Sequence, residues 1–354
     1  MTTSPRAARL PEIDWLKGLA ILWVVCIHAK LGASTFLYEY TVNRAVPIFL
    51  VLFGVTSEFW WRRSLETRTP SVTTRMWYAS RFGRLVPPFW AMAAVWWAFV
   101  LRFDGRDALH LGVQKAAATF AGYAPWIGTS WFVTVVFQLV VVFPALRWLW
   151  LRGGARISLA LMAALSAVCV WYLWSIVEAG RWLFGNDVPE PGWYYFWIFS
   201  PRVFWQVASG VFIARRWGGR PSRRISLAMA AITLLSACVA VAVRANPDDP
   251  FYAPLKQQTI QYLADVPLAI ALLGAFVHVP TPEFVRRSLS WCGTHSWGIY
   301  LGHLLVHEVL HLRGIAPETG PELVRALYAL FLFVCGAGLA AVGSRFRKWI
   351  SRRS

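Results

Sequence analysis

The chain has 354 residues, of which 57% are hydrophobic and 15% are charged, and its mean hydropathy is +0.49. A soluble domain carries about 25% charged residues, so this chain has too little polar surface to cover a water-soluble particle and is expected to be a polytopic membrane protein. Its net charge of +18 does not indicate a nucleic-acid partner, because no soluble basic domain remains once the apolar segments are removed.

Ten apolar runs are close to the length of about 17 to 25 residues that a helix needs to cross a bilayer. In chain order they are 13–31, 44–61, 85–101, 131–150, 157–177, 194–214, 225–243, 259–279, 291–312 and 322–343. They predict an all-α membrane protein with a single transmembrane domain over residues 1–354 and no appended soluble domain. A weaker amphipathic helix is expected at 108–124, on the outer surface or half-buried.

The basic residues in the connections predict the orientation, because cytoplasmic loops carry an excess of Lys and Arg. With the N-terminus inside, the inner connections hold 23 Lys and Arg and the outer ones hold 7, and the alternation never breaks. Both termini are therefore expected in the cytoplasm, and the protein is expected in the cytoplasmic (inner) membrane with lipid as a partner. The sequence indicates no oligomeric state.

The first apolar run carries the ionisable residues Asp14, Lys17 and His28 along its length. At about 100° per residue, His28 lies within about 20° of the helix face of Lys17, so the three share one stripe. Charged groups are costly in hydrocarbon, and this stripe is expected to face the interior of the bundle. The alternative is a snorkelling pair at the cytoplasmic edge and a histidine that only bonds a neighbouring helix.

The segment before the third run contains Arg81 and Arg84, followed by Pro87 and Pro88. We expect both arginines at the cytoplasmic entrance of the third helix. They suit lipid phosphates as anchors, and they equally suit the phosphates of a ligand, which guanidinium groups bind in a bidentate manner.

Three later runs also contain polar groups. Trp131 and Gln138 share the fourth run with Pro144, and Arg202 follows Pro201, where we expect a broken helix buried in protein. In the ninth run His303, His307 and His311 are each four residues apart. This spacing could chelate zinc, but Glu308, the one acidic or cysteine residue near the histidines at a suitable spacing, points to another face of the helix. We therefore predict no metal.

The pattern resembles acyltransferase family 3, integral-membrane enzymes that move acyl groups from coenzyme A onto surface carbohydrates and other acceptors. Ten spans with both termini inside agree with this family. Its signatures correspond here to Asp14, Lys17 and His28; to Arg81 through Pro88; to Trp131 through Pro144, with Gln138; and to Gly293 through His303, with Ser296 and Tyr300. One position departs from the pattern, because Val136 stands where many members carry Glu.

The resemblance implies an O-acyltransferase that takes acyl-coenzyme A, expected to be acetyl-coenzyme A, as a co-substrate and holds no bound cofactor. Its acceptor would be a hydroxyl of a carbohydrate, such as a surface glycan or its precursor, or of a small metabolite. We predict that Lys17, Arg81 and Arg84 bind the donor and that His28 is catalytic. Supporting roles are predicted for Asp14, Trp131, Gln138, Arg202, Ser296, Tyr300 and His303.

His28 could act as a general base toward the acceptor hydroxyl or be acylated itself and pass the group on. Lys17 lies about 16 Å away along the helix, a length comparable to a pantetheine arm. Asp14 is too far along the helix to orient His28, so we assign it to holding Lys17 or Arg81. The partner of His28 is expected on another helix, with His303 or Tyr300 as candidates.

The donor is expected to enter from the cytoplasm, and the acceptor from the outer half of the bilayer, where outer-loop aromatics would frame it. These aromatics are Trp126, Trp193, Tyr194 and Tyr195; membrane-interface aromatics are the alternative. A secondary transporter of a small polar or anionic solute is the alternative function, although the sequence lacks paired halves with matching interruptions. A structural or lipid-scaffolding protein would not explain the buried Lys17, His28 and Arg202.

Overall fold

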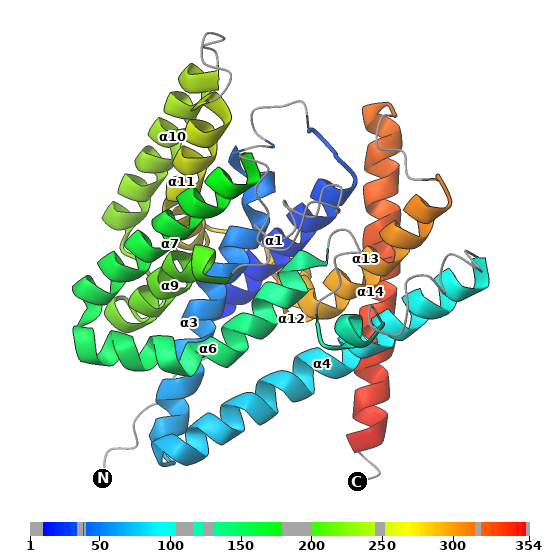
Figure 1. The fold of residues 1–354 in the computed structure, drawn as a ribbon, viewed down its shortest axis with the longest axis horizontal. Helices are drawn as coiled ribbons and strands as arrows, with labels where there is room; N and C mark the ends of the chain where they lie inside the picture. Colours follow the sequence, from blue (N-terminus) through cyan, green and yellow to red (C-terminus); the bar gives the residue numbers. More distant parts are fainter. Residues whose placement is uncertain are drawn as a thin grey trace.

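The structure is a computed structural model that describes part of the chain. The described residues are 10–33, 38, 40–103, 116–122, 130–178, 200–244, 252–315 and 320–351, and in 103, 170–178, 200, 243–244, 252–261 and 346–351 the description covers only the backbone. These residues form helices and turns and include no β-strand (Figure 1). The predicted all-α class is therefore confirmed.

Each of the ten predicted apolar segments overlaps a helix, and most boundaries lie within a few residues of the predicted ones. The elements are α1 (Pro11–His28), η1 (Val42–Arg44), α3 (Ala45–Leu65), α4 (Pro70–Phe103), α6 (Trp131–Gly153), α7 (Ala155–Glu178), η2 (Ser200–Val203), α9 (Phe204–Arg216), α10 (Arg223–Arg244), α11 (Tyr252–His278), α12 (Glu283–Thr294), α13 (Ser296–Leu312) and α14 (Glu322–Ser351).

Five helical segments are long and apolar enough to cross a membrane, judged by length and composition over the described part of the chain. They are Val42–Leu65, Pro70–Arg102, Trp131–Gly153, Arg223–Ala242 and Glu322–Arg345. Large apolar side chains on α7, α10 and α14 are exposed, including Leu161, Leu234 and Leu327. Such surfaces suit contact with lipid, and these segments make this a membrane protein.

The structure breaks two of the predicted helices. The predicted single helix over 291–312 is wrong, because the chain turns at His295 and divides it into α12 and α13. Helix α12 begins at Glu283, after Pro282. Its first residues lie in a polar segment for which the sequence predicted no helix. In the sixth segment, residues 194–199 lie outside the described part; the remainder is the turn η2 followed by α9, as expected of a helix broken near Pro201.

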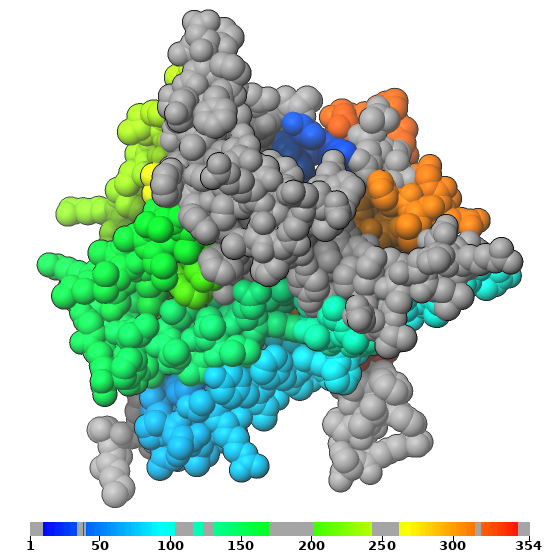
Figure 2. All heavy atoms as spheres, in the orientation of Figure 1, coloured from blue at the N-terminus to red at the C-terminus, as the bar shows by residue number. Residues whose placement is uncertain are grey.

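Helix α4 begins at Pro70, well before the predicted start at residue 85, and continues through Pro87 and Pro88 to Phe103. Proline at the first helical position is favourable because its missing N–H would have no partner there. Figure 1 shows α4 crossing the molecule at a steep angle to α14, and Figure 2 shows the first part of α4 beside α6 and α7. Arg81 and Arg84 therefore lie inside a helix and not at its entrance, which corrects the sequence prediction.

Helix α1 lies in the middle of the bundle and contacts α3, α11, α12, α13 and α14. Its contact with α12 is backbone to backbone: a Cβ at Gly18 would collide with the carbonyl of Leu289, and one at Gly293 would collide with the carbonyl of Asp14. Small residues allow such close approach between membrane helices. This contact holds the first half of α1 in place.

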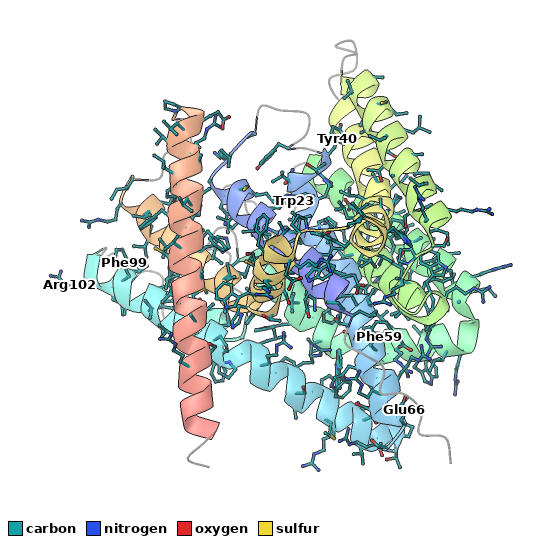
Figure 3. All side chains as sticks on the ribbon, turned by 180° about the vertical axis from the view of Figure 1, so that it is seen from behind. Trp23, Tyr40, Phe59, Glu66, Phe99 and Arg102 are labelled. Atoms are coloured by element: carbon teal, nitrogen blue, oxygen red, sulfur yellow. The ribbon has the colours of Figure 1, made fainter. Side chains whose placement is uncertain are left out.

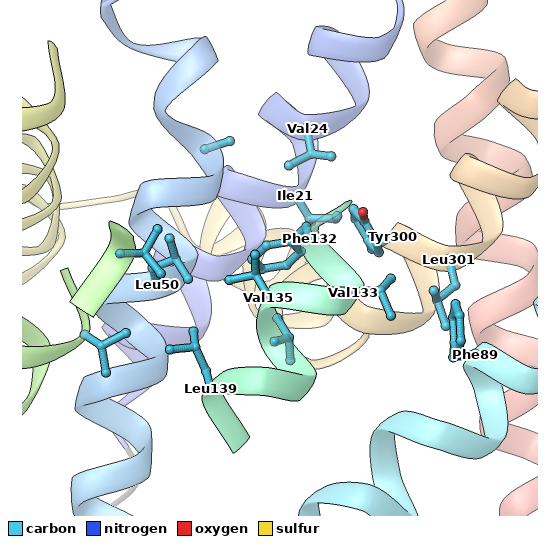
Figure 4. Packing of buried hydrophobic residues seen from close by; sticks show 14 of the residues in the cluster. Ile21, Val24, Leu50, Phe89, Phe132, Val133, Val135, Leu139, Tyr300 and Leu301 are labelled. Atoms are coloured by element: carbon cyan, nitrogen blue, oxygen red, sulfur yellow. The ribbon is translucent and has the colours of Figure 1, made fainter. Parts of the chain in front are cut away.

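The largest apolar core joins α1, α3, α4, α6, α9 and α13. Figure 4 shows Ile21 of α1, Phe132 of α6 and Tyr300 of α13 meeting near its centre. Seen from behind in Figure 3, Tyr40 and Glu66 mark opposite ends of the region around α3, and Phe99 and Arg102 mark the far end of α4. The apolar core lies between these two ends of the bundle.

Candidate active site

His28 is the last residue of α1, and it lies against two histidines of α13. Its Nδ1 is 3.0 Å from Nε2 of His303, and its ring centroid is 4.9 Å from that of His303 and 5.3 Å from that of His307. His303 and His307 are four residues apart on one helix and therefore point to the same side. The packing of α1 against α13 thus gathers three imidazoles that are far apart in the sequence.

Hydrogen bonding assigns the protons on this pair. His303 Nδ1 lies 2.9 Å from the carbonyl oxygen of Ile299, and because a carbonyl only accepts, this nitrogen carries the hydrogen. In a neutral imidazole the other nitrogen is then an acceptor, so His28 Nδ1 donates to His303 Nε2. The unprotonated nitrogen of His28 is consequently Nε2, which leaves a lone pair available to take a proton.

His303 is fully buried, and aromatic contacts hold its surroundings. Tyr300 lies 5.6 Å from His303, 5.6 Å from Phe132 and 5.7 Å from Trp297 between ring centroids. The Trp297 Nε1 donates to the carbonyl of Leu85 at 3.2 Å, which connects α13 to α4. Ser296, at the start of α13, is half-buried. Tyr300 therefore supports His303 and does not itself bond His28 in the structure.

The residues after His28 are held by α14. Arg325 donates to the carbonyl of Lys30 at 2.9 Å and pairs with Glu322 at 2.6 Å, and Glu322 accepts from the backbone N–H of Gly32 at 3.2 Å. These bonds clamp the chain just beyond α1. The clamp restricts the position of His28 from one side, and the contact with α12 restricts the helix from the other.

The other two charged residues of the predicted stripe lie on the first half of α1. Asp14 is buried and Lys17 is half-buried, and the backbone of Asp14 forms the close contact with Gly293. Both side chains take part in interactions within the protein. The assignment of Asp14 to holding Lys17 or Arg81 stays a prediction.

Arg81 and Arg84 lie one turn apart on α4 in different surroundings. The Arg81 guanidinium is 4.5 Å from the ring centroid of Trp77, and the buried Trp77 donates to the carbonyl of Val140 at 2.9 Å. Arg84 is exposed. Stacking on an aromatic face holds a guanidinium group without using its hydrogen-bond donors, so Arg81 is oriented and keeps donors for a ligand.

Trp131 and Arg202 are brought together although they are distant in sequence. The guanidinium of the buried Arg202 lies 5.7 Å from the ring centroid of Trp131, and the Tyr262 hydroxyl donates to the Arg202 carbonyl. Gln138 is half-buried two turns further along α6. These supporting residues do not bond His28 in the structure.

The two most deeply buried carboxylates of the described residues, Asp265 and Glu58, were not among the predicted site residues. Asp265 pairs with Arg44 at 3.5 Å and accepts from Gln206 at 3.3 Å, and Gln206 in turn accepts from Tyr262 at 3.3 Å. The rule that a charge within a membrane span indicates a functional site would have selected Asp265. This network lies beside Arg202 and joins η1, α9 and α11.

The second missed carboxylate, Glu58, is fully buried between two arginines. It lies 2.8 Å from Arg147 Nε and 2.7 Å from Arg215, and the Arg147 guanidinium is 5.1 Å from the ring centroid of Trp61. Only tertiary packing brings Arg147 and Arg215 to Glu58, because the three residues lie far apart in the sequence. This group joins α3, α6 and α9.

Val136 is buried in the apolar core with Val133 and Val135. Apolar packing therefore fills the position at which the resemblance leads us to expect a carboxylate. Over the described ranges, no group of three or more His, Cys, Asp or Glu residues is arranged to hold a metal. The predicted outer aromatics Trp126, Trp193, Tyr194 and Tyr195 lie outside the described residues, as does much of the predicted helix 108–124.

Comparison with known proteins identifies the family. No curated protein and no solved structure matches the chain significantly. The family described as "Acyltransferase domain", acyltransferase family 3, matches residues 10–345, nearly the whole length. This range includes His28, His303, Arg81 and Arg84. The chain therefore belongs to acyltransferase family 3 and is a membrane acyltransferase.

Proposed function

We propose that the protein transfers an acetyl or other short acyl group from acyl-coenzyme A to a hydroxyl of a carbohydrate, either a surface glycan or its precursor, or of a small metabolite. The observation that carries this proposal is the bond between His28 and His303. It leaves a basic nitrogen on His28 in a chain whose family is that of acyltransferases. A general base is what a hydroxyl acceptor requires.

In the reaction, His28 Nε2 takes the proton of the acceptor hydroxyl while the oxygen attacks the thioester carbonyl carbon. The carbon–oxygen bond forms, the carbon–sulfur bond breaks, and the coenzyme A thiolate leaves and takes a proton from solvent. The same nitrogen would serve a relay in which His28 is first acylated. Direct transfer is preferred, because the hydrogen bond to His303 stabilises the imidazolium that a general base becomes.

In the proposed reaction, His303 is a neutral residue that orients His28. Its Nε2 accepts from His28 Nδ1 both before and after His28 is protonated, because Nδ1 keeps its hydrogen throughout. A carboxylate often performs this task in catalytic histidine pairs. Here a second imidazole performs it, and Val136 occupies the apolar core at the position of the family's frequent glutamate.

The donor is proposed to bind with its phosphates on Lys17, Arg81 and Arg84. Arg81 is oriented by Trp77, and Arg84 is exposed one turn away, so the two can address different phosphate oxygens. His28 comes eleven positions after Lys17 on α1, which corresponds to about 16 Å at the helical rise. This distance matches an extended pantetheine arm between bound phosphates and the base.

The proposed topology has ten spans across the cytoplasmic membrane, with both termini in the cytoplasm. The excess of Lys and Arg in alternate connections supports it. In Figure 1 the C-terminal ends of α3 and α14 point to one end of the molecule, and the His28 end of α1 lies toward the other. The donor would then enter from the cytoplasm and the acceptor from outside.

Trp131 and Arg202 are proposed to assist the acceptor. An aromatic face and a guanidinium group are suited to the apolar face and the hydroxyls of a sugar, and the two side chains already lie together. Gln138, Ser296 and Tyr300 are proposed to support this region. Neither a metal nor a bound cofactor is required for the chemistry described.

Mass spectrometry of surface glycans and small metabolites from cells with and without the gene tests the function. A product that is heavier by one acyl group in the presence of the gene identifies donor and acceptor together. His28→Ala should remove that product while the protein is still inserted in the membrane, with a loss of about 100-fold or more in rate. Equal product from wild type and His28→Ala would contradict the assignment.

A further inference from the structure

The row of histidines continues beyond the pair that the proposed chemistry uses. His307 Nδ1 lies 3.0 Å from the Tyr328 hydroxyl, and the His307 ring is stacked on that of His311 at 6.1 Å between centroids. Exposure increases along the row: His303 is fully buried, His307 is 6% exposed, and His311 lies at the surface end of α13. The imidazoles thus form a path from the reaction centre to the surface.

We propose that this path carries away the proton that His28 takes from the acceptor, with His307 as the first carrier and His311 as the second. The proposal rests on the proposed function. A proton bound at His28 Nε2 passes to His307, then to His311, and then to water at the end of α13. The ring centroids of His28 and His307 are 5.3 Å apart, so the two imidazoles are in contact and a ring rotation can bring their nitrogens together.

His307 is suited to this task, and His303 is not. A carrier imidazole takes up a second proton and then gives one up, so neither of its nitrogens can be fixed as a permanent donor. In His303 the Nδ1–H is held by the carbonyl of Ile299, which cannot exchange a proton with it. In His307 the Nδ1 faces the Tyr328 hydroxyl, which both donates and accepts. His307 can therefore change between its two neutral forms.

The surroundings of the path come from three helices. On α13 the buried Glu308 follows His307 directly, and on α14 Tyr328 lies against His307. Near the end of the path, Arg325 and Glu322 hold each other and the chain after α1. Helix α4 bonds α13 at its other end, through Trp297.

In the proposed path, the two proton movements of the reaction occur at different places. The departing thiolate takes one proton on the donor side, and the hydroxyl proton is released where α13 ends. In the proposed topology these are opposite sides of the membrane. Acyl transfer would then be coupled to the release of one proton outside for each proton taken up inside.

The test is chemical rescue of His307→Gln and His311→Gln, because glutamine keeps hydrogen bonding but cannot carry a proton. Purified protein is given acetyl-coenzyme A and isolated surface polysaccharide, and only O-acylated polysaccharide is counted. We expect the rate to fall about tenfold in each variant and to recover with added imidazole, since an exogenous base replaces a missing proton carrier. His278→Gln, whose histidine bonds the Pro221 carbonyl elsewhere, should match wild type with and without imidazole.

His311 is exposed, so His311→Gln keeps the test valid if His307→Gln fails to fold. Wild-type rates in a folded His311→Gln protein, or slow rates that imidazole does not raise, would overturn the path while leaving the acyltransferase proposal intact. A wild-type protein that transfers no acyl group from any acyl-coenzyme A would overturn both proposals. The two failures are therefore distinguishable.

Discussion

At the scale of the residue, the proposed chemistry depends on the imidazole of His28, and its neighbour His303 determines which nitrogen of His28 is unprotonated. His303 bonds the carbonyl of its own helix with one nitrogen and His28 with the other. Because an imidazole has only two nitrogens, these two contacts determine the protonation of the pair. In the proposed reaction, a neutral imidazole thus selects the nitrogen of His28 that takes the proton.

Substitution of His303 tests this orienting role. In His303→Gln the amide oxygen can still accept from His28 Nδ1, whereas in His303→Leu nothing can. We expect kcat to fall by about 100-fold in His303→Leu and by only about tenfold in His303→Gln, with the KM for acetyl-coenzyme A unchanged in both. Steady-state kinetics checks this. Equal losses in the two variants would show that His303 only fills space.

The arginines of α4 are tested by donor affinity. We expect Arg81→Ala and Arg84→Ala each to weaken coenzyme A binding about tenfold, because each loses a charge-assisted bond to phosphate of about 1.5 to 3 kcal/mol. Arg75→Ala is the matched control, since Arg75 is exposed on the same helix. Isothermal titration calorimetry measures the affinity. Unchanged affinity in both variants would assign Arg81 and Arg84 to lipid anchoring.

At the scale of the element, the contact between α1 and α12 positions the stripe that carries Lys17 and His28. Neither Gly18 nor Gly293 has room for a Cβ, because the opposing atoms belong to backbone, which cannot rotate away. The separation of the two helices is therefore set by these glycines. Any larger residue must push α1 out of its place.

Gly18→Ala and Gly293→Ala test this contact. Each should lower the free energy of unfolding by about 1 to 3 kcal/mol through overpacking and reduce acyl transfer by displacing His28. Gly338→Ala is the control, because no atom lies within 4 Å of its Cβ position. Thermal unfolding in detergent measures the effect. If all three variants melt like wild type, the close contact does not determine the position of α1.

At the scale of the whole molecule, the arginines proposed to bind the donor lie on α4, and the histidines lie on α1 and α13. Arg81 belongs to the group of Trp77 and Phe143, and His28 lies at the far end of α1 beside α14. The proposed reaction thus requires the acyl arm to extend along α1 while the nucleotide stays near α4.

Sealed vesicles test this separation. Right-side-out vesicles loaded with radiolabelled acetyl-coenzyme A should acylate surface polysaccharide that is supplied outside and cannot enter. Inverted vesicles should require the donor outside and the acceptor inside. Vesicles containing His28→Ala are the control for leakage. Transfer only when donor and acceptor share one compartment would contradict a passage through the membrane.

The sequence by itself determined the class of the protein and much of the candidate site. Apolar length and helical periodicity are local properties, so the ten segments could be located from them, and each overlaps a helix. His28, Arg81 and His303 could be selected because ionisable groups are costly inside a membrane. The helix break at His295 could not be predicted, because the apolar run over residues 291–312 continues through it.

The tertiary structure alone decided which of these groups meet. His28 and His303 are 275 residues apart, and Glu58 is paired with arginines from two other helices. Such contacts depend on how the helices pack, which backbone approach at Gly18 and Gly293 controls. The sequence indicates that a charged residue lies within an apolar segment. Its partner, which offsets the cost of burying the charge, is determined only by the packing of the helices.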